Sequence, residues 1–178
     1  MFRIMEKRLL APAVHQLVVE APLAARSARP GNFVIVRTNE TGERIPLTIA
    51  DYDPEKGTVT LVVQEVGKST MDIGMMEAGD SFADVAGPLG QATPIKKVGT
   101  VVGVAGGIGV APLLPQIKLH KEIGNHVITI VGARTRDLLI LKDETEQASH
   151  EVILATDDGS FGYHGFVTAA LEELIKKA

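Results

Sequence analysis

The sequence predicts an antiparallel β-barrel followed by a parallel α/β domain. From about residue 3 to residue 82 the apolar residues fall into short runs of strand length separated by turn-forming residues, which is typical of a small barrel. From residue 97 onward the order changes to strand, glycine-rich turn, helix and strand, as in a parallel α/β domain. We therefore expect a barrel domain over 1–96 and an α/β domain over 97–178.

The barrel strands are expected where apolar and β-branched residues cluster. The runs are HQLVVEA, GNFVIVRT, IPLTIADY, GTVTLVVQEV and DSFADVAG, at 15–21, 31–38, 45–52, 57–66 and 80–87. Proline, glycine, asparagine and aspartate lie between the runs and favour chain reversal, because they fix φ or tolerate positive φ. These turns fall at 30–32, 39–42, 53–57 and 79–80.

The α/β domain is predicted from three apolar strands alternating with helices. The strands are TVVGVAG, HVITIVGA and EVILATDDG, at 100–106, 126–133 and 151–159. A helix that stops at Gly124 follows the first strand, a helical stretch lies within 136–149, and GFVTAALEELIKKA forms a final helix. Because a sheet of three parallel strands keeps an unpaired edge, we expect this domain to be incomplete.

Composition excludes several classes of function. The net charge of −4 and the 4% aromatic content offer neither a basic surface nor stacking platforms for nucleic acid. No apolar run approaches the roughly 20 residues of a membrane span, and the first residues lack a signal-peptide core, so a cytoplasmic protein is expected. The chain has no cysteine, which excludes disulfides, thiol catalysis and clusters ligated by its own thiolates. The five histidines show no metal-ligand or triad spacing, so neither a metal site nor a catalytic residue is expected.

A Gly-Lys-Ser-Thr segment at 67–70 resembles the end of an ATP-binding P-loop. That loop needs a glycine five residues before the Gly-Lys pair, and Val62 occupies that position. The residues between favour extended backbone. Gly67, Lys68, Ser69 and Thr70 therefore hold a different phosphate or none.

A glycine-rich turn lies between the first strand and the first helix of the α/β domain. Its residues Gly106, Gly107 and Gly109 would let backbone approach a pyrophosphate at a helix N-terminus. Pro112 stands where the ordinary dinucleotide fingerprint has a third glycine, and proline is tolerated in a first helical turn. A purely structural turn is the alternative.

Polar residues follow the next two strands. Arg134 suits the extra phosphate of NADP, whereas NAD-binding sheets carry an acid near this place. A solvated charge closing a strand is an equally good interpretation. Asp157 lies at the carboxyl end of the third strand, where open α/β sheets bind ligands, although Asp-Gly sequences also form simple turns.

The barrel half contains Arg44-Ile45-Pro46-Leu47-Thr48. An arginine can bind phosphate through two hydrogen bonds, and a threonine hydroxyl can bind a ring nitrogen or carbonyl. The pattern is weak by itself, because such residues are common on strand surfaces.

Taken in order, these segments resemble the ferredoxin–NADP reductase superfamily. The shared series is an RxPLT-type strand, GKST, GPLG, GGIGVAP, GAR followed by DLLI, and TDDGSFGYHG, and it runs along essentially the whole chain. Within the superfamily the sequence is most similar to the small FAD-binding subunit of NADH-dependent ferredoxin:NADP oxidoreductase. The electron-transfer subunits of sulfide dehydrogenase and dihydroorotate dehydrogenase are related families.

The resemblance implies an FAD-binding barrel and a nicotinamide-nucleotide domain. Residues 67–70 would cradle the FAD pyrophosphate with Arg44, while Pro46, Leu47 and Thr48 would line the isoalloxazine, where many relatives have an aromatic residue in place of Leu47. Pro88 and Gly90 of the GPLG segment are further FAD-binding candidates. The candidates for NAD(H) or NADP(H), a choice left open, are Gly106, Gly107, Gly109, Pro112, Arg134 and Asp157.

The activity implied by the resemblance is electron transfer from NAD(P)H through FAD to a larger subunit that holds flavin and iron–sulfur clusters, and indirectly to ferredoxin, with electron bifurcation possible in such complexes. Relatives continue into a cysteine-rich 2Fe-2S loop, and these 178 residues contain no cysteine to ligate one. The alternatives are a dihydroorotate dehydrogenase-type electron-transfer subunit, a reductase of free flavin, and a flavin-free regulatory or assembly subunit. The oligomeric state is left open.

Overall fold

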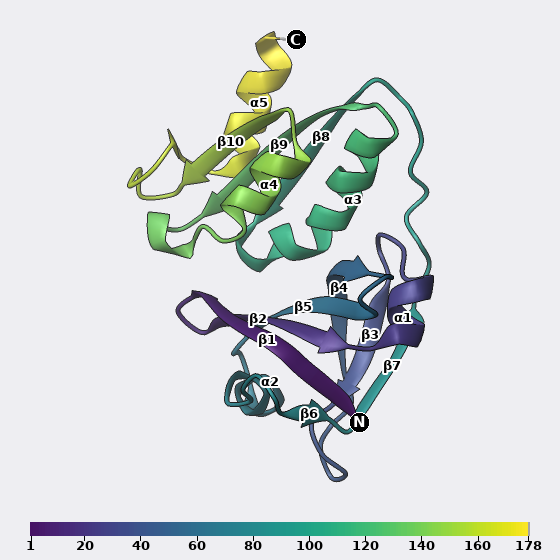
Figure 1. Ribbon diagram of the computed structural model, residues 1–178. Helices are drawn as coiled ribbons and strands as arrows, with labels where there is room; N and C mark the ends of the chain where they lie inside the picture. Colours follow the sequence, from purple (N-terminus) through teal and green to yellow (C-terminus); the bar gives the residue numbers. More distant parts are fainter. Residues whose placement is uncertain (178) are drawn as a thin grey trace. The chain divides into compact units, whose positions relative to one another are not determined.

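The computed structural model describes residues 1–177, so Ala178, the last residue of the expected α/β domain, lies outside the described residues. The chain divides into two compact units, one spanning Met1–Thr93 and the other beginning at Pro94 (Figure 1). The predicted fold class, a barrel-like antiparallel sheet followed by a parallel α/β sheet, is confirmed.

The first unit is a seven-stranded antiparallel sheet with the order β6-β1-β2-β5-β4-β3-β7. Its strands are β1 (Phe2–Ala11), β2 (Val14–Glu20), β3 (Phe33–Arg37), β4 (Ile45–Asp53), β5 (Thr58–Gln64), β6 (Ser81–Phe82) and β7 (Asp84–Leu89). Two short helices accompany them, α1 (Pro22–Ser27) and α2 (Lys68–Gly74). Alternate side chains of the strands face inward, as the period of two requires.

The interior of this unit holds an apolar cluster drawn from every strand and from both helices. Its largest fully buried side chains are Ile4, Leu17, Ile49, Leu61, Ile73 and Phe82. Since Ile73 is the buried residue of α2, the segment after β5 is fixed to the barrel by apolar packing.

Two elements of the barrel were not predicted. In β1 the charged residues 6–8 interrupt the apolar pattern, and register shifts between Ile4 and Glu6 and between Leu9 and Ala11 break the alternation. Such bulges reverse which face a residue occupies, so the period of two is lost in the sequence. For α1, the sequence feature that indicates a helix is Pro22, which lies in the first helical turn.

The second unit is a four-stranded parallel sheet with the order β11-β10-β9-β8. The strands are β8 (Thr100–Gly106), β9 (His126–Ala133), β10 (Glu151–Thr156) and the short β11 (Tyr163–His164), which was not predicted. The helices are α3 (Val110–Glu122), α4 (Lys142–Ala148) and α5 (Val167–Lys177), with 3₁₀ turns η1 (Gly107–Gly109) and η2 (Arg136–Leu138). Within residues 1–177 no helix is long and apolar enough to cross a membrane.

Helices cover both faces of the parallel sheet (Figure 1). A Cβ on Gly103 of β8 would lie 3.0 Å from Ile117 of α3, whereas a Cβ on Gly132 of β9 would lie 2.3 Å from Val167 of α5. Gly103 is paired with Thr129, three residues before Gly132, so the two glycines face opposite sides. Each glycine therefore lets a helix approach its own face of the sheet closely.

We expect Leu61→Ala to lower the free energy of unfolding by about 2–5 kcal/mol, because Leu61 is fully buried and its removal leaves a cavity. The matched control is Leu23→Ala on α1, where the leucine is 78% exposed and the change should stay within about 0.5 kcal/mol. Urea denaturation followed by circular dichroism measures both. Equal losses in the two variants would contradict this description of the core.

Candidate functional site

One exposed stripe of β4 contains three of the predicted barrel residues. Arg44, just before the strand, and Pro46 and Thr48 within it are exposed, while the residues between them turn toward the core. Leu47 packs against the core cluster, so its side chain lies on the opposite face from Pro46 and Thr48. Arg44, Pro46 and Thr48 therefore lie together on one exposed face. Leu47 can contribute only its backbone atoms to that face.

The same part of β4 has a free edge. Pairing with β5 begins only at Ile49, whereas residues 45–48 pair with β3 alone. The Ile49 N–H donates to the Asn32 carbonyl at 3.1 Å, and bonded positions alternate along an antiparallel pair. The N–H and C=O of Thr48 consequently point away from β3, toward this edge, where a planar polar ring can bind them.

Apolar side chains lie beside the stripe on the neighbouring strands. Phe33 is opposite Thr48 on β3 and opposite Leu89 on β7. Gly90 has a φ of +79°, and a Cβ there would lie 2.9 Å from the Phe33 ring. The segment that contains the predicted residues Pro88 and Gly90 therefore lies against β3, the strand that pairs with Thr48.

Arg44 is held only loosely. Its Nη2 lies 3.2 Å from Oδ2 of Asp84, and the same carboxylate oxygen lies 2.7 Å from Nη2 of Arg37. The Arg44 side chain is 64% exposed, and exposed ion pairs of this kind contribute little free energy. Arg44 can therefore turn toward an anionic ligand at low cost.

Thr70 shapes the segment before α2. Its hydroxyl oxygen accepts hydrogen bonds from the N–H groups of Val66 at 2.9 Å and Gly67 at 3.0 Å, and the hydroxyl donates to the Gly67 carbonyl at 2.9 Å. This is the side-chain half of a helix cap, and it uses the only proton that Thr70 has. In this conformation Thr70 positions Gly67 and has no hydroxyl donor to spare for a phosphate.

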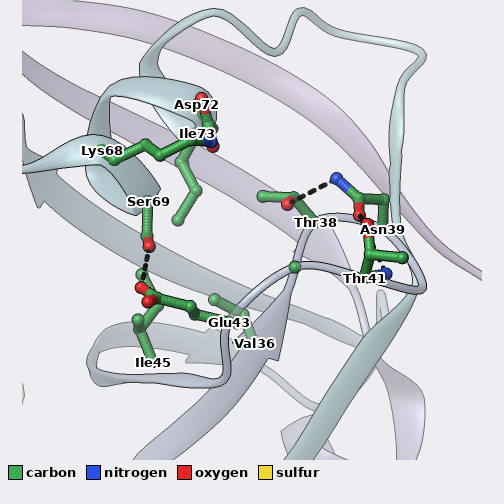
Figure 2. Close-up of a pocket in the computed structure, with 11 residues that line it drawn as sticks. Val36, Thr38, Asn39, Thr41, Glu43, Ile45, Lys68, Ser69, Asp72 and Ile73 are labelled. Carbon is green, nitrogen blue, oxygen red and sulfur yellow. Dashed lines mark hydrogen bonds and ion pairs between the residues drawn. The ribbon is translucent and has the colours of Figure 1, made fainter.

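Lys68 and Ser69 border a cavity of about 230 Å³ between α2 and the β3–β4 loop. Its wall is formed by Val36, Thr38, Asn39, Thr41, Gly42, Glu43, Ile45, Lys68, Ser69, Asp72 and Ile73 (Figure 2). Lys68 Nζ lies 2.8 Å from Asp72 Oδ2, and this hydrogen bond raises the pKa of Lys68 above its usual value. The Ser69 hydroxyl donates to the carboxylate of Glu43, a residue that sequence reasoning missed.

The glycine turn of the second unit lies at the carboxyl end of β8. Gly107 has a φ of +54°, which favours glycine, but Gly106 is extended and Gly109 is helical. A Cβ on any of the three would have no protein atom within 4 Å. Since neither backbone nor packing requires glycine at Gly106 and Gly109, the open space there suits a ligand that approaches the backbone closely. Pro112 lies in the first turn of α3.

Arg134 and Asp157 follow adjacent strands, β9 and β10, and both are exposed. The Asp157 N–H donates to the Ala133 carbonyl at 3.1 Å, so the two chain segments remain paired beyond the strands. The two predicted residues therefore lie on the same edge of the sheet, and the register also places Gly106 at that edge, opposite Gly132.

This edge has features that the sequence did not reveal. The Arg136 guanidinium lies 5.3 Å and the Lys142 ammonium 5.6 Å from the centre of the Phe161 ring. The Ser160 hydroxyl accepts a hydrogen bond from the Arg136 N–H at 2.8 Å. That hydroxyl and the Ser160 N–H donate to Asp158 and lower its pKa, so this bonding is present at neutral pH and lost as the pH falls through the lowered pKa.

Within residues 1–177 no group of three or more His, Cys, Asp or Glu side chains could hold a metal ion. No cysteine is present in the sequence, so its residues do not fit a thiolate-ligated 2Fe-2S cluster.

Comparisons with known proteins decide the family. No family model matches the chain. A Thermotoga maritima protein described as a dihydroorotate dehydrogenase B (NAD(+)) electron transfer subunit homolog is 45% identical over 174 residues, which cover 98% of this chain and 61% of that protein. The dihydroorotate dehydrogenase B (NAD(+)) electron transfer subunit of Enterococcus faecalis is 34% identical over 182 residues, which cover 99% of this chain and 68% of that one. This chain belongs to their family, in the ferredoxin–NADP reductase superfamily.

A solved structure shows the same relationship. A chain of an NADH-dependent reduced ferredoxin-NADP oxidoreductase, studied for flavin-based electron bifurcation, matches with a TM-score of 0.95 and 40% identity. The match covers 100% of this chain and 64% of that one. The chain thus spans less than two thirds of the length of this relative and of the Thermotoga protein.

Gly132 of β9 and Gly109 of the glycine turn should respond differently to substitution. Gly109→Ala should change the free energy of unfolding by no more than about 1 kcal/mol, because its Cβ meets open space in an allowed conformation. Gly132→Ala should lower it by about 1–3 kcal/mol, because its Cβ would overlap Val167. Chemical denaturation of both variants measures the difference, and a larger loss for Gly109→Ala would contradict the open space at the turn.

Proposed function

We propose that this chain binds FAD on its barrel unit and NAD(H) on its α/β unit, and that it serves as an electron-transfer subunit of an oxidoreductase. The observation that carries the proposal is the free edge of β4, with Arg44, Pro46 and Thr48 exposed beside it. The likeness to an NADH-dependent reduced ferredoxin-NADP oxidoreductase and to dihydroorotate dehydrogenase B (NAD(+)) subunits supports it.

The barrel residues suit the two chemical halves of FAD. The Thr48 backbone and hydroxyl would bind polar atoms of the isoalloxazine, with Pro46 against the ring. Arg44 would bind the pyrophosphate with Lys68 and Ser69, while Thr70 holds Gly67 in place. FAD, when bound, supplies an acceptor for the hydride of a reduced nicotinamide and a donor of single electrons.

The α/β residues suit a dinucleotide. Gly106, Gly107 and Gly109 would let backbone approach its pyrophosphate, with Pro112 starting the helix behind them. Arg134 and Asp157 would lie near its adenosine half. We favour NAD(H) over NADP(H) because NAD(+) or NADH appears in the descriptions of the relatives, although Arg134 also suits a 2′-phosphate.

The chain's own task in this chemistry is binding and orientation. Hydride transfer needs no general acid or base, and no residue here is assigned as one. The electrons would leave to a larger subunit that holds flavin and iron–sulfur clusters, and indirectly to ferredoxin in a bifurcating complex. The alternative is delivery to a dihydroorotate dehydrogenase subunit, which the descriptions of the curated relatives favour.

Arg44→Ala and Thr48→Ala should each weaken FAD binding by about 10- to 100-fold, because each removes a hydrogen bond to a charged or buried polar group of the ligand. Quenching of flavin fluorescence on titration of the flavin-free protein measures the dissociation constant. The control is Arg26→Ala, which removes an exposed arginine on α1 and should leave it unchanged. If both site variants bind FAD as the native protein does, FAD does not bind at this edge.

In the native protein, NADH added without oxygen should bleach the visible flavin bands, and NADPH should do so more slowly. Gly109→Ala should reduce the bleaching rate at least about tenfold at unchanged flavin content, because its Cβ occupies the space proposed for the dinucleotide. Absorption spectra with each nucleotide test both statements. Bound flavin that neither nucleotide bleaches would contradict the nucleotide site, and a protein that takes up no flavin would favour a regulatory or assembly role.

A further inference from the structure

Glu43 places a carboxylate against a residue that we assign to the flavin phosphate. It precedes Arg44 on the β3–β4 loop, and its carboxylate accepts the hydrogen bond of the Ser69 hydroxyl on α2 (Figure 2). The two residues are 26 positions apart in the sequence. This bond connects the loop to α2 beside the 230 Å³ cavity that both residues line.

The same carboxylate acts on the neighbouring cation. Asp72 is the main partner of Lys68, and the negative charge of Glu43 adds to the rise in the pKa of that ammonium. Each of the three side chains assigned to the phosphate is therefore already engaged by an internal carboxylate: Ser69 by Glu43, Lys68 by Asp72 and Arg44 by Asp84. Glu43 differs from Asp72 and Asp84 because its partner, the Ser69 hydroxyl, carries no positive charge to neutralise the carboxylate.

We propose that Glu43 is an internal anion that holds the Ser69 hydroxyl in the flavin-free protein and opposes the FAD pyrophosphate, so that FAD binds only as Glu43 leaves Ser69. This inference rests on the proposed function. A diphosphate that binds the Ser69 hydroxyl must take the place of the Glu43 carboxylate, and at such short separation the two negative charges repel. Glu43 thereby lowers FAD affinity and makes it depend on a turn of the Glu43 side chain away from Ser69.

The loop is built to keep its shape while Glu43 moves. Asn39 Oδ1 accepts hydrogen bonds from the N–H of Thr41 at 3.1 Å and from its hydroxyl at 3.0 Å, and the Asn39 carbonyl accepts from Gly42 N–H at 3.1 Å. These bonds lie within the loop and do not involve Glu43. The Glu43 side chain can therefore turn away from Ser69 without loss of the turn.

A carboxylate in this position could instead accept hydroxyl groups of a ribose, and that role predicts the opposite result. An acceptor for ribose hydroxyls strengthens FAD binding, so its removal weakens the complex. An internal anion weakens FAD binding, so its removal strengthens the complex. The observed partner, the hydroxyl of a serine assigned to the phosphate, favours the internal anion.

The test compares Glu43→Gln with the native protein in flavin-free form. Glutamine keeps an oxygen that accepts the Ser69 hydrogen bond and removes only the charge. Glu40→Gln is the matched control, since Glu40 is an exposed glutamate of the same loop outside the cavity wall. Flavin fluorescence quenching, at equilibrium and by stopped flow, measures FAD and riboflavin binding, because riboflavin has the same ring and no phosphate.

We expect Glu43→Gln to bind FAD at least about fivefold more tightly, with riboflavin binding unchanged and Glu40→Gln like the native protein. Unchanged or weaker FAD binding by Glu43→Gln, while the native protein binds FAD, would overturn this inference and leave the proposed function standing. An equal gain for riboflavin would also overturn it, because the effect would then lie at the ring. Failure of the native protein to bind FAD would overturn the proposed function and the inference together.

Discussion

The candidate flavin site depends on one feature of the barrel, the late start of pairing between β4 and β5. Ile49 is the first residue of β4 with a partner on β5, and residues 45–48 are bonded on the β3 side only. An unpaired strand edge is ordinarily a liability, because its N–H and C=O groups attract other chains. Here the exposed stripe of Arg44, Pro46 and Thr48 runs along that edge, where we propose that the flavin ring binds.

The charges around the site follow from the same geometry. Arg44 ends the stripe and is balanced by Asp84, which the β3–β7 register places opposite Arg37. The adjacent Glu43 lines the cavity, and its carboxylate accepts the hydrogen bond of Ser69 on α2. Glu43 and Arg44 are adjacent in the sequence, so one short segment contributes both the cation that we propose for the phosphate and the carboxylate that we propose opposes it.

The sequence was sufficient for most of the architecture and for less of the site. The strands β8, β9 and β10 and the turn at Gly106 to Gly109 were predictable, because long apolar runs and glycines act locally. The strand β1 was not, because its bulges move residues from one face to the other. Nor could the sequence show that Leu47 packs inward while Thr48 faces out, or that Glu43 reaches Ser69, since these depend on strand register and on contacts between distant segments.

The glycines show how structure separates folding requirements from ligand requirements. Gly132 and Gly103 are needed by the fold, because helices on each face occupy the space that a Cβ would take. Gly106 and Gly109 are not needed in that way, since their backbone angles suit any residue and their Cβ positions are open. Such a glycine costs conformational entropy on folding and returns no packing, and we infer that a ligand accounts for it. At the carboxyl end of a parallel strand and the start of a thirteen-residue helix, an anionic ligand is the most economical explanation, because both the backbone N–H groups and the helix dipole point there.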